Sequence, residues 1–212
     1  METSPSFEAL LRSGDARTWD DLVESVGPAA MLVRIERRMG EGLRSRLTAE
    51  DVWQETLLHA WRDRERHEWR GVASFRRWLL EIAENRIRDA ADHSSTLRRG
   101  ARIVRSVDAA RAGESHPPSS FGGVFSSSTP SRHATHREQA EVMRRALEQV
   151  PELQREVLWR RLFEEQGLDE IAAAMNLSHA AVKHRLRKGS LVYRERLRAL
   201  FRSPSDASAG NP

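Results

Sequence analysis

The chain of 212 residues contains no cysteine. Disulfides, thiolate metal sites and cysteine nucleophiles are therefore excluded, and the absence of thiols fits a reducing compartment. Tyrosine occurs only once, and the alternation of apolar and polar residues that is typical of half-buried strands is hard to find. The composition therefore predicts a soluble helical protein.

Long hydrophobic runs are also lacking. No apolar stretch approaches the roughly 20 residues that a membrane-spanning helix needs, so membrane insertion is not expected. The first residues, METSPSFEALLRSGDARTWDDL, are acidic and interrupted by charges, which does not match a signal peptide. We therefore expect a cytoplasmic protein.

Lysine is almost absent, because Lys183 and Lys188 are the only two in the chain. Lys and Arg together number 35 against 31 Asp and Glu, which gives a net charge of +4. With the two signs nearly balanced, binding to nucleic acid must depend on where the positive charge lies rather than on its total.

The segment from Leu168 to Leu197, LDEIAAAMNLSHAAVKHRLRKGSLVYRERL, predicts a short helix, a tight turn and a longer basic helix. Asn176 stands where the turn needs a left-handed backbone, which Asn tolerates better than most residues. Ser178 is a good N-cap for the second helix, with Leu177 and Val182 as its hydrophobic staple. Gly189 is expected to bend or fray that helix, at about 1 kcal/mol relative to Ala.

The second helix of this segment exposes basic and hydrogen-bonding side chains between its apolar positions. Such a surface suits entry into the major groove of DNA, so the segment is interpreted as a DNA-binding helix-turn-helix. Its exposed residues are His179, Lys183, His184, Arg185, Arg187 and Lys188.

The composition divides the chain into two helical blocks. Residues 94–135 are rich in Ser, Gly and Pro and poor in apolar anchors, which predicts a flexible linker, although Ser95–Arg111 has some helical character. The expected domains are therefore residues 1–93 and 136–203, and residues 204–212 form a disordered polar tail. The sequence shows no internal repeat.

Helical periodicity predicts the elements of both blocks. Thr48 is expected to cap a helix that runs to about His67, and Ser74 the helix after it. Pro151 is expected at the first position of its helix. The remaining expected helices of the first block are Phe7–Leu11, Trp19–Val26 and Ala29–Met39, the last ended by Gly40 and Gly42. The expected inward residues are Val52, Thr56, Leu57, Ala60 and Trp61, then Phe75, Trp78, Leu79, Ile82 and Ile87, and in the second block Val142, Ala146, Leu147, Val150, Leu153, Val157, Leu158 and Leu162.

Several motifs in the two blocks together narrow the choice of family. The first block contains DxxQETxxxAW from Asp51 to Trp61 and SFxxWLxxIAxNxxxD from Ser74 to Asp89. The second contains LxxxPxLQREVLxxR, EIAxxMxLS and VKxRLRKG. In their order and spacing, these motifs resemble the bacterial RNA polymerase sigma factors of the sigma-70 family, particularly the small extracytoplasmic-function (ECF) class.

The resemblance implies an all-α fold with a region 2-like domain and a helix-turn-helix, region 4-like domain on a flexible linker. It implies two partners, core RNA polymerase, contacted through the coiled-coil of its largest subunit, and promoter DNA. An anti-sigma factor would be a further partner, although no residue pattern identifies one. The implied function is promoter-specific transcription initiation.

Three sets of residues match the functional positions of this family. The set for the upstream (−35) promoter element is Ser178, His179, Ala180, Lys183, His184, Arg185, Arg187 and Lys188. The set for recognition and melting of the downstream (−10) element is Trp69, Arg70, Phe75, Arg76, Arg77, Asn85, Arg86 and Arg88. The set for docking on core polymerase is Asp51, Gln54, Glu55, His59, Trp61 and Arg62.

Two other classes of function compete with this interpretation. A helix-turn-helix repressor or activator that never engages polymerase would use the second block alone. A helical nuclease would use clustered carboxylates such as Glu50, Asp51 and Glu55, but capping and docking explain these acids. No phosphate-binding loop, metal-ligand set or nucleophile with its base can be assembled, so neither a cofactor nor an enzymatic activity is expected.

Overall fold

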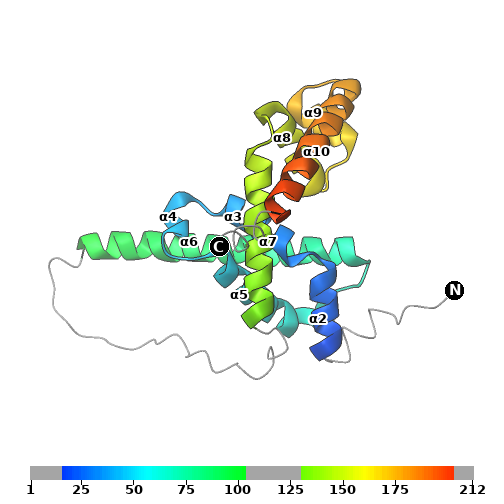
Figure 1. The fold of residues 1–212 in the computed structure, drawn as a ribbon. Helices are drawn as coiled ribbons and strands as arrows, with labels where there is room; N and C mark the ends of the chain where they lie inside the picture. The colour runs from blue at the N-terminus through cyan, green and yellow to red at the C-terminus, as the bar shows by residue number, and fades with distance from the viewer. Residues whose placement is uncertain (1–15, 104–129, 203–212) are drawn as a thin grey trace, which may run out of the picture. The chain divides into compact units, whose positions relative to one another are not determined.

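The computed structural model describes residues 16–103 and 130–202, and the residues in regular structure there are helical. No strand occurs in these two ranges, so the prediction of an all-α fold is confirmed. Contacts divide the chain into two compact units, Met1–His136 and Arg137–Pro212, which are described separately below (Figure 1). The predicted helix Phe7–Leu11, most of the predicted linker and all of the predicted tail lie outside the described residues.

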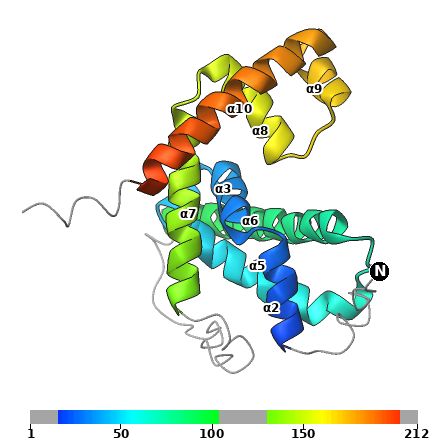
Figure 2. The ribbon, with the colours of Figure 1, turned by 45° about the vertical axis from the view of Figure 1, so that its right-hand side comes forward.

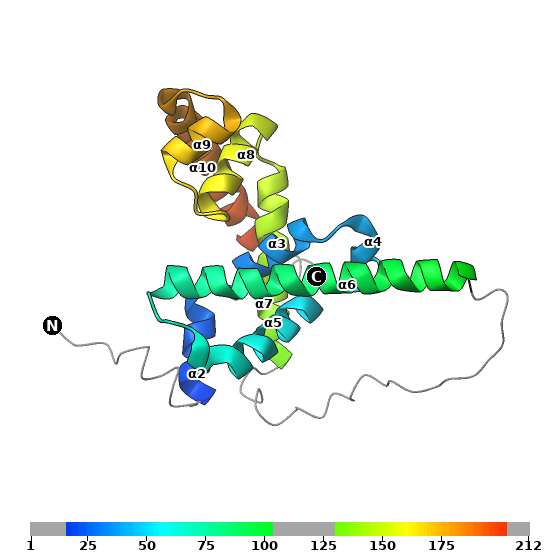
Figure 3. The same ribbon diagram turned by 180° about the vertical axis from the view of Figure 1, so that it is seen from behind.

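The first unit is organised around α5 and α6, which contact each other and both contact α3 (Figure 3). Its core contains the fully buried side chains of Met31, Ile35, Val52, Phe75 and Leu79. The helices of this unit are α2 (Ala16–Ser25), α3 (Pro28–Arg38), α4 (Glu41–Arg44), α5 (Ala49–Asp63), the 3-10 turn η1 (Arg64–Arg66) and α6 (Val72–Ile103).

The start of α5 agrees with its sequence. Thr48 Oγ1 accepts the amide N–H of Asp51 (3.1 Å), and Asp51 Oδ2 accepts the amide N–H of Thr48 (2.9 Å). This reciprocal capping box satisfies two amides that the first turn would leave without partners. The cap predicted at Thr48 is confirmed, and the helix ends through η1 close to His67.

The start of α6 corrects the sequence prediction. The helix begins at Val72, and Ser74 lies inside it rather than at its N-cap. Gly71 has a positive φ of 94°, a conformation that glycine adopts without strain, and its carbonyl accepts the amide N–H of Phe75 (3.1 Å). The turn that starts the helix is therefore made by the glycine.

Other boundaries and burial assignments in this unit also differ from expectation. Helix α3 ends at Arg38, just before Gly40 as expected, but Gly42 lies within a further short helix, α4, that was not expected. Trp53 is buried although it was not assigned to the stripe of α5, while Trp61 is only half-buried. Helix α6 continues to Ile103 and α7 begins at Pro130, so helical structure enters both ends of the predicted linker.

The second unit contains the last part of α7 (Pro130–Glu148), followed by α8 (Glu152–Leu162), α9 (Leu168–Met175) and α10 (His179–Arg202). Helices α8, α9 and α10 all contact one another (Figure 2). Buried Val157, Leu158, Trp159 and Phe163 form much of the α8 side of this core.

Three expectations for α8 were wrong. Leu153 and Leu162 were expected to face inward, yet they are 61% and 48% exposed. Trp159 and Phe163 take the inward positions instead, with their rings stacked at 4.6 Å between centroids. Pro151 lies at the N-cap, with an extended ψ of 142°, rather than at the first helical position. The aromatic pair thus sets which side of α8 is buried.

Candidate nucleic-acid interface

The turn between α9 and α10 has the backbone that its sequence predicts. Asn176 adopts the left-handed conformation (φ 51°, ψ 50°) and ends α9. The amide N–H of Leu177 donates to the carbonyl of Ala172 (2.9 Å), and Ser178 Oγ accepts the amide N–H of Ala181 (3.2 Å). Both the left-handed turn and the Ser178 cap are therefore confirmed.

A small apolar cluster holds the two helices of this motif together. Val157 of α8, Ile171 of α9 and Val182 of α10 are completely buried in contact with one another. The turn residue Leu177 packs against this cluster, as expected of a hydrophobic staple. The other partly buried members are Leu168, Ala172, Met175 and Leu186. Because three helices meet here, the outward face of α10 is held in a fixed orientation within the unit.

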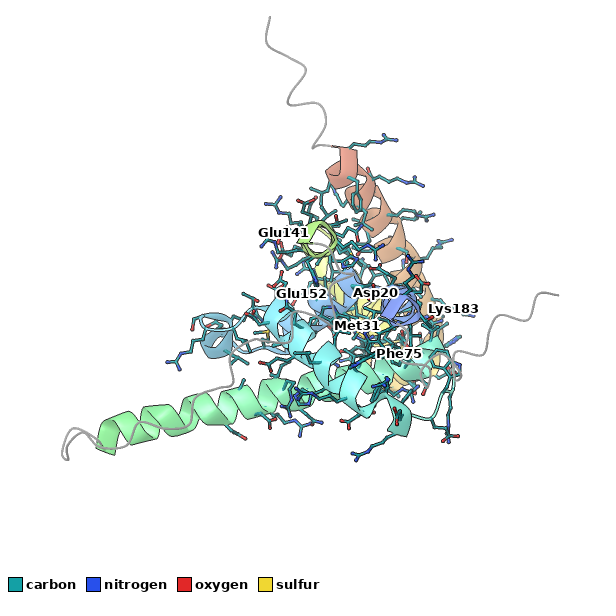
Figure 4. The ribbon with its side chains drawn as sticks, turned by 90° about the horizontal axis from the view of Figure 1, so that it is seen from below. Asp20, Met31, Phe75, Glu141, Glu152 and Lys183 are labelled. Atoms are coloured by element: carbon teal, nitrogen blue, oxygen red, sulfur yellow. The ribbon has the colours of Figure 1, made fainter. Side chains whose placement is uncertain are left out.

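That outward face carries most of the residues expected to read the upstream element. Ser178, His179, Ala180, Lys183, His184, Arg187 and Lys188 are exposed, and Arg185 is half-buried. Lys183 is labelled on α10 in Figure 4. His179 Nε2 lies 3.7 Å from Asp169 Oδ1 of α9. The set is thus displayed on one helix, while its contact with DNA stays a prediction.

Gly189 has a different role from the one expected. Helix α10 continues through it to Arg202 without interruption, and the glycine is buried. A Cβ atom at this position would lie 3.0 Å from Gln154 Cβ and 3.3 Å from the Gln154 carbonyl oxygen of α8. The missing side chain therefore allows α8 and α10 to approach closely, which is why the chain has glycine there.

An aromatic cluster surrounds the loop before α6. His67 and Trp78 are stacked, with ring centroids 4.4 Å apart and an interplanar angle of 15°. The centroid of the Phe75 ring lies 5.8 Å from those of Trp19 and of Trp78, and 6.1 Å from that of Trp69. His67 was not identified from the sequence, because no local pattern predicts its stacking on a tryptophan eleven residues later.

Burial corrects one assignment in the downstream-element set. Phe75, labelled in Figure 4, is 0% exposed, so it has no face on which a base could stack. Trp69 is half-buried and keeps part of its surface open. The stacking surface expected in this loop therefore depends on Trp69, whose ring packs at a tilt against that of Phe75.

The arginines of this set differ in their internal contacts. Arg70 donates to the Glu68 carboxylate (2.7 Å), which lowers the pKa of Glu68 and raises that of Arg70. Arg76 Nε donates to the carbonyl of Val26 at the end of α2 (3.0 Å), so its guanidinium ties two helices together. Arg77 is exposed and forms no ion pair with another residue in the described ranges.

Farther along α6, one arginine bridges to α5. Arg86 donates to His59 Nε2 (3.3 Å) and forms an ion pair with Asp89 (2.6 Å). Because a guanidinium only donates, His59 Nε2 must accept and its proton lies on Nδ1. The pKa of His59 is lowered mainly by burial and, to a smaller extent, by the positive charges of Arg86 and Arg62. Asn85 Oδ1 accepts a hydrogen bond from Arg88 on the same exposed helix face (2.6 Å).

The expected polymerase-docking set lies mostly on the outer side of α5. Gln54, Glu55 and Arg62 are exposed, while His59 is half-buried against Arg86. Asp51 is exposed but already engaged in the capping box, so its carboxylate has a structural partner. This face carries both signs of charge and amide groups, a mixture that suits a protein partner better than a run of phosphates.

Trp61 forms the edge of this face. Its ring contacts Trp19 edge-on (5.2 Å) and lies under the guanidinium of Arg64, which is 4.2 Å from the ring centroid. Arg64 also donates to the carbonyl of Trp61 (2.8 Å). Arg64 was not predicted from the sequence; its position three residues after a tryptophan was the available signal.

Neither a metal site nor a membrane-crossing helix is found in the part of the chain that the structure describes. No group of three or more His, Asp or Glu side chains there is arranged to hold an ion. None of the helices described is both long enough and apolar enough to cross a lipid bilayer.

Comparison with protein families gives two matches. The model described as Sigma-70 region 2 matches residues 22–96, and the model described as Sigma-70, region 4 matches residues 140–190. Together they cover more than half of the chain, one in each compact unit. No curated protein matches the chain.

Proposed function

Because the chain belongs to the sigma-70 family of RNA polymerase sigma factors, we propose that it is an ECF-type sigma factor. In this proposal it binds core RNA polymerase in the bacterial cytoplasm and directs it to promoters with two separate elements. The polymerase performs the chemistry, and this chain supplies promoter specificity and strand capture without enzymatic activity of its own.

The observation that carries the proposal is the presence of both family regions in one chain, in order, each within its own unit. A stand-alone helix-turn-helix regulator has no need of region 2. Two modules held on one polymerase bind DNA more tightly than either does alone, because the second contact becomes intramolecular. The two-unit architecture therefore supports bipartite promoter recognition.

The second unit supports recognition of the upstream element through α10. Its N-terminal half exposes Lys183 and Arg187, which suit phosphates or guanine, and His179 and His184, which suit base edges. The left-handed Asn176 and the Ser178 cap fix where this helix begins relative to α9. Direct base contacts require such a fixed orientation.

The first unit supports capture of the downstream element. A strand that leaves the duplex is held by stacking on aromatic rings and by cations along its backbone. Half-exposed Trp69 supplies a ring, and Arg70, Arg77 and Arg88 are exposed around the same helix and loop. The buried Phe75 holds the loop in place and makes no contact with DNA in this proposal.

Core polymerase would dock on the outer face of α5, and gel filtration of the full chain with purified core polymerase tests this. The native chain is expected to co-elute, and Glu55→Arg is expected to weaken the complex by reversing a charge on the exposed face. Glu81→Arg is the matched control, since Glu81 is also exposed but lies on α6. Equal weakening by both substitutions would argue against docking through α5.

Failure of the native chain to co-elute with core polymerase, together with specific DNA binding, would instead favour a stand-alone regulator.

A further inference from the structure

Exposed cations continue along α10 well beyond the residues assigned to the upstream element. Successive residues of an α-helix are about 100° apart, so Arg187, Arg194 and Arg198 all lie within about 60° of Lys183 around the helix. All four side chains are exposed. We call these four residues the basic stripe. At about 1.5 Å of rise per residue, the stripe extends over about 22 Å.

The cations of the stripe are not neutralised by the protein. In the ranges the structure describes, none of the four forms an ion pair, and Glu195 is the single acidic residue of α10. Arginines on other helices are commonly paired, as Arg38 is with Glu84, Arg145 with Glu141 and Arg160 with Glu156. A row of exposed, unpaired cations along one side of the helix matches an anionic partner.

The geometry of α10 limits which part of a DNA duplex the stripe can reach. The first half of the helix would occupy the major groove, and a straight helix then leaves the curved surface of the duplex gradually. Arg194 lies about 10 Å and Arg198 about 16 Å beyond Arg187 along the axis. Long arginine side chains at those distances meet the phosphates that border the groove rather than base edges.

We propose that Arg194 and Arg198 form a second, sequence-independent DNA-binding site, which holds the phosphate backbone beside the upstream element. This inference rests on the proposed function, because it extends the interface formed by the first half of α10. The site contributes affinity and register, while the residues in the groove contribute sequence specificity. Arg194, being closer to the groove, contributes more than Arg198.

The test is the salt dependence of DNA binding by the full chain, measured by fluorescence anisotropy with a labelled duplex of about 40 base pairs. Each lost phosphate contact lowers the slope of log K against log salt by about 0.9. Arg194→Ala combined with Arg198→Ala is therefore expected to lower the slope by up to about 1.8. The affinity at 0.1 M salt should fall on the order of tenfold or more, to a similar extent on duplexes of different sequence.

Arg196→Ala is the matched control, since Arg196 is an exposed arginine of the same helix about 140° away from Lys183. For the Arg196→Ala variant, the slope of log K against log salt should equal that of the native chain. An unchanged slope in the Arg194 and Arg198 double variant would overturn the inference. If the same variant nevertheless lost transcription with polymerase, the stripe would be assigned to an acidic protein surface instead.

A second pair of variants separates this inference from the proposed function. Lys183→Ala with Arg187→Ala should reduce the slope and also the preference for a promoter duplex. If that pair has no effect on DNA binding, the assignment of α10 itself fails. If it behaves as expected while Arg194 and Arg198 have no effect, only the second site fails.

Discussion

Gly189 provides a quantitative test of how the helix-turn-helix unit is packed. In an exposed helix, replacing glycine by alanine stabilises the fold by up to about 1 kcal/mol, because glycine has the greater conformational freedom when unfolded. At Gly189 the new Cβ would lie 3.0 Å from Gln154 Cβ and 3.3 Å from the Gln154 carbonyl oxygen. Adding a carbon atom to a well-packed contact costs about 1–3 kcal/mol.

The steric cost of the added Cβ is larger than the gain in helix propensity. Gly189→Ala should therefore destabilise the protein by about 0–2 kcal/mol. Gly189→Val should lower the free energy of unfolding further, since two further methyl groups enter the same contact. For a unit of this size, 1 kcal/mol corresponds to about 4–8 °C in Tm. Urea and thermal unfolding of the full chain, followed by circular dichroism, would measure both changes.

Gly42 is the matched control for this substitution. It lies within helix α4, and a Cβ there would meet no atom within 4 Å. Gly42→Ala should therefore be neutral or stabilising by up to about 1 kcal/mol. The reasoning is refuted if Gly189→Ala stabilises the protein as much as Gly42→Ala does.

Three further predictions follow from named contacts. Thr48→Ala removes one half of the capping box of α5 and should cost about 1 kcal/mol in urea unfolding, whereas Thr48→Ser should retain most of the stability. Tyr193 has a buried hydroxyl with no hydrogen-bond partner among the described residues, and burial raises its pKa to about 12, so Tyr193→Phe should be neutral or stabilising by about 1 kcal/mol in the same assay. Burial is the main cause that lowers the pKa values of His59 and His67 below the ordinary 6.5. Both imidazoles therefore bind a proton more readily in the unfolded chain than in the folded one. Stability is therefore expected to fall as the pH decreases below about 6.5, and His59→Gln, which keeps an acceptor for Arg86, should reduce that dependence; an identical pH profile would contradict it.

The sequence predicted best where a single residue dictates the backbone. The left-handed turn at Asn176 and the caps at Thr48 and Ser178 depend on local hydrogen bonds, so local sequence was sufficient. Helical periodicity and the order of the motifs were likewise enough for the all-α fold and the family.

The errors came from packing between elements that are distant in the chain. Gly189 was expected to weaken α10, because nothing near it in sequence shows that Gln154 approaches it. Leu153 and Leu162 were expected to be buried, but Trp159 and Phe163 turn a different side of α8 inward.

Functional assignment in the first unit met the same limit. Phe75 and Arg76 belong to residue types suited to single-stranded DNA. One is nevertheless enclosed by aromatic rings, and the other donates to the carbonyl of Val26. Helical spacing places both residues on a helix, but it does not show which neighbours cover or engage them.

Run-off transcription most directly tests the claim that this chain is an initiation factor. Purified core polymerase would be supplied with a library of bacterial genomic fragments, with and without the full chain. New, discrete start sites that share two spaced motifs are expected, and the Lys183→Ala and Arg187→Ala double variant should lose them. The absence of new start sites, although the chain still binds DNA and core polymerase, would contradict the claim.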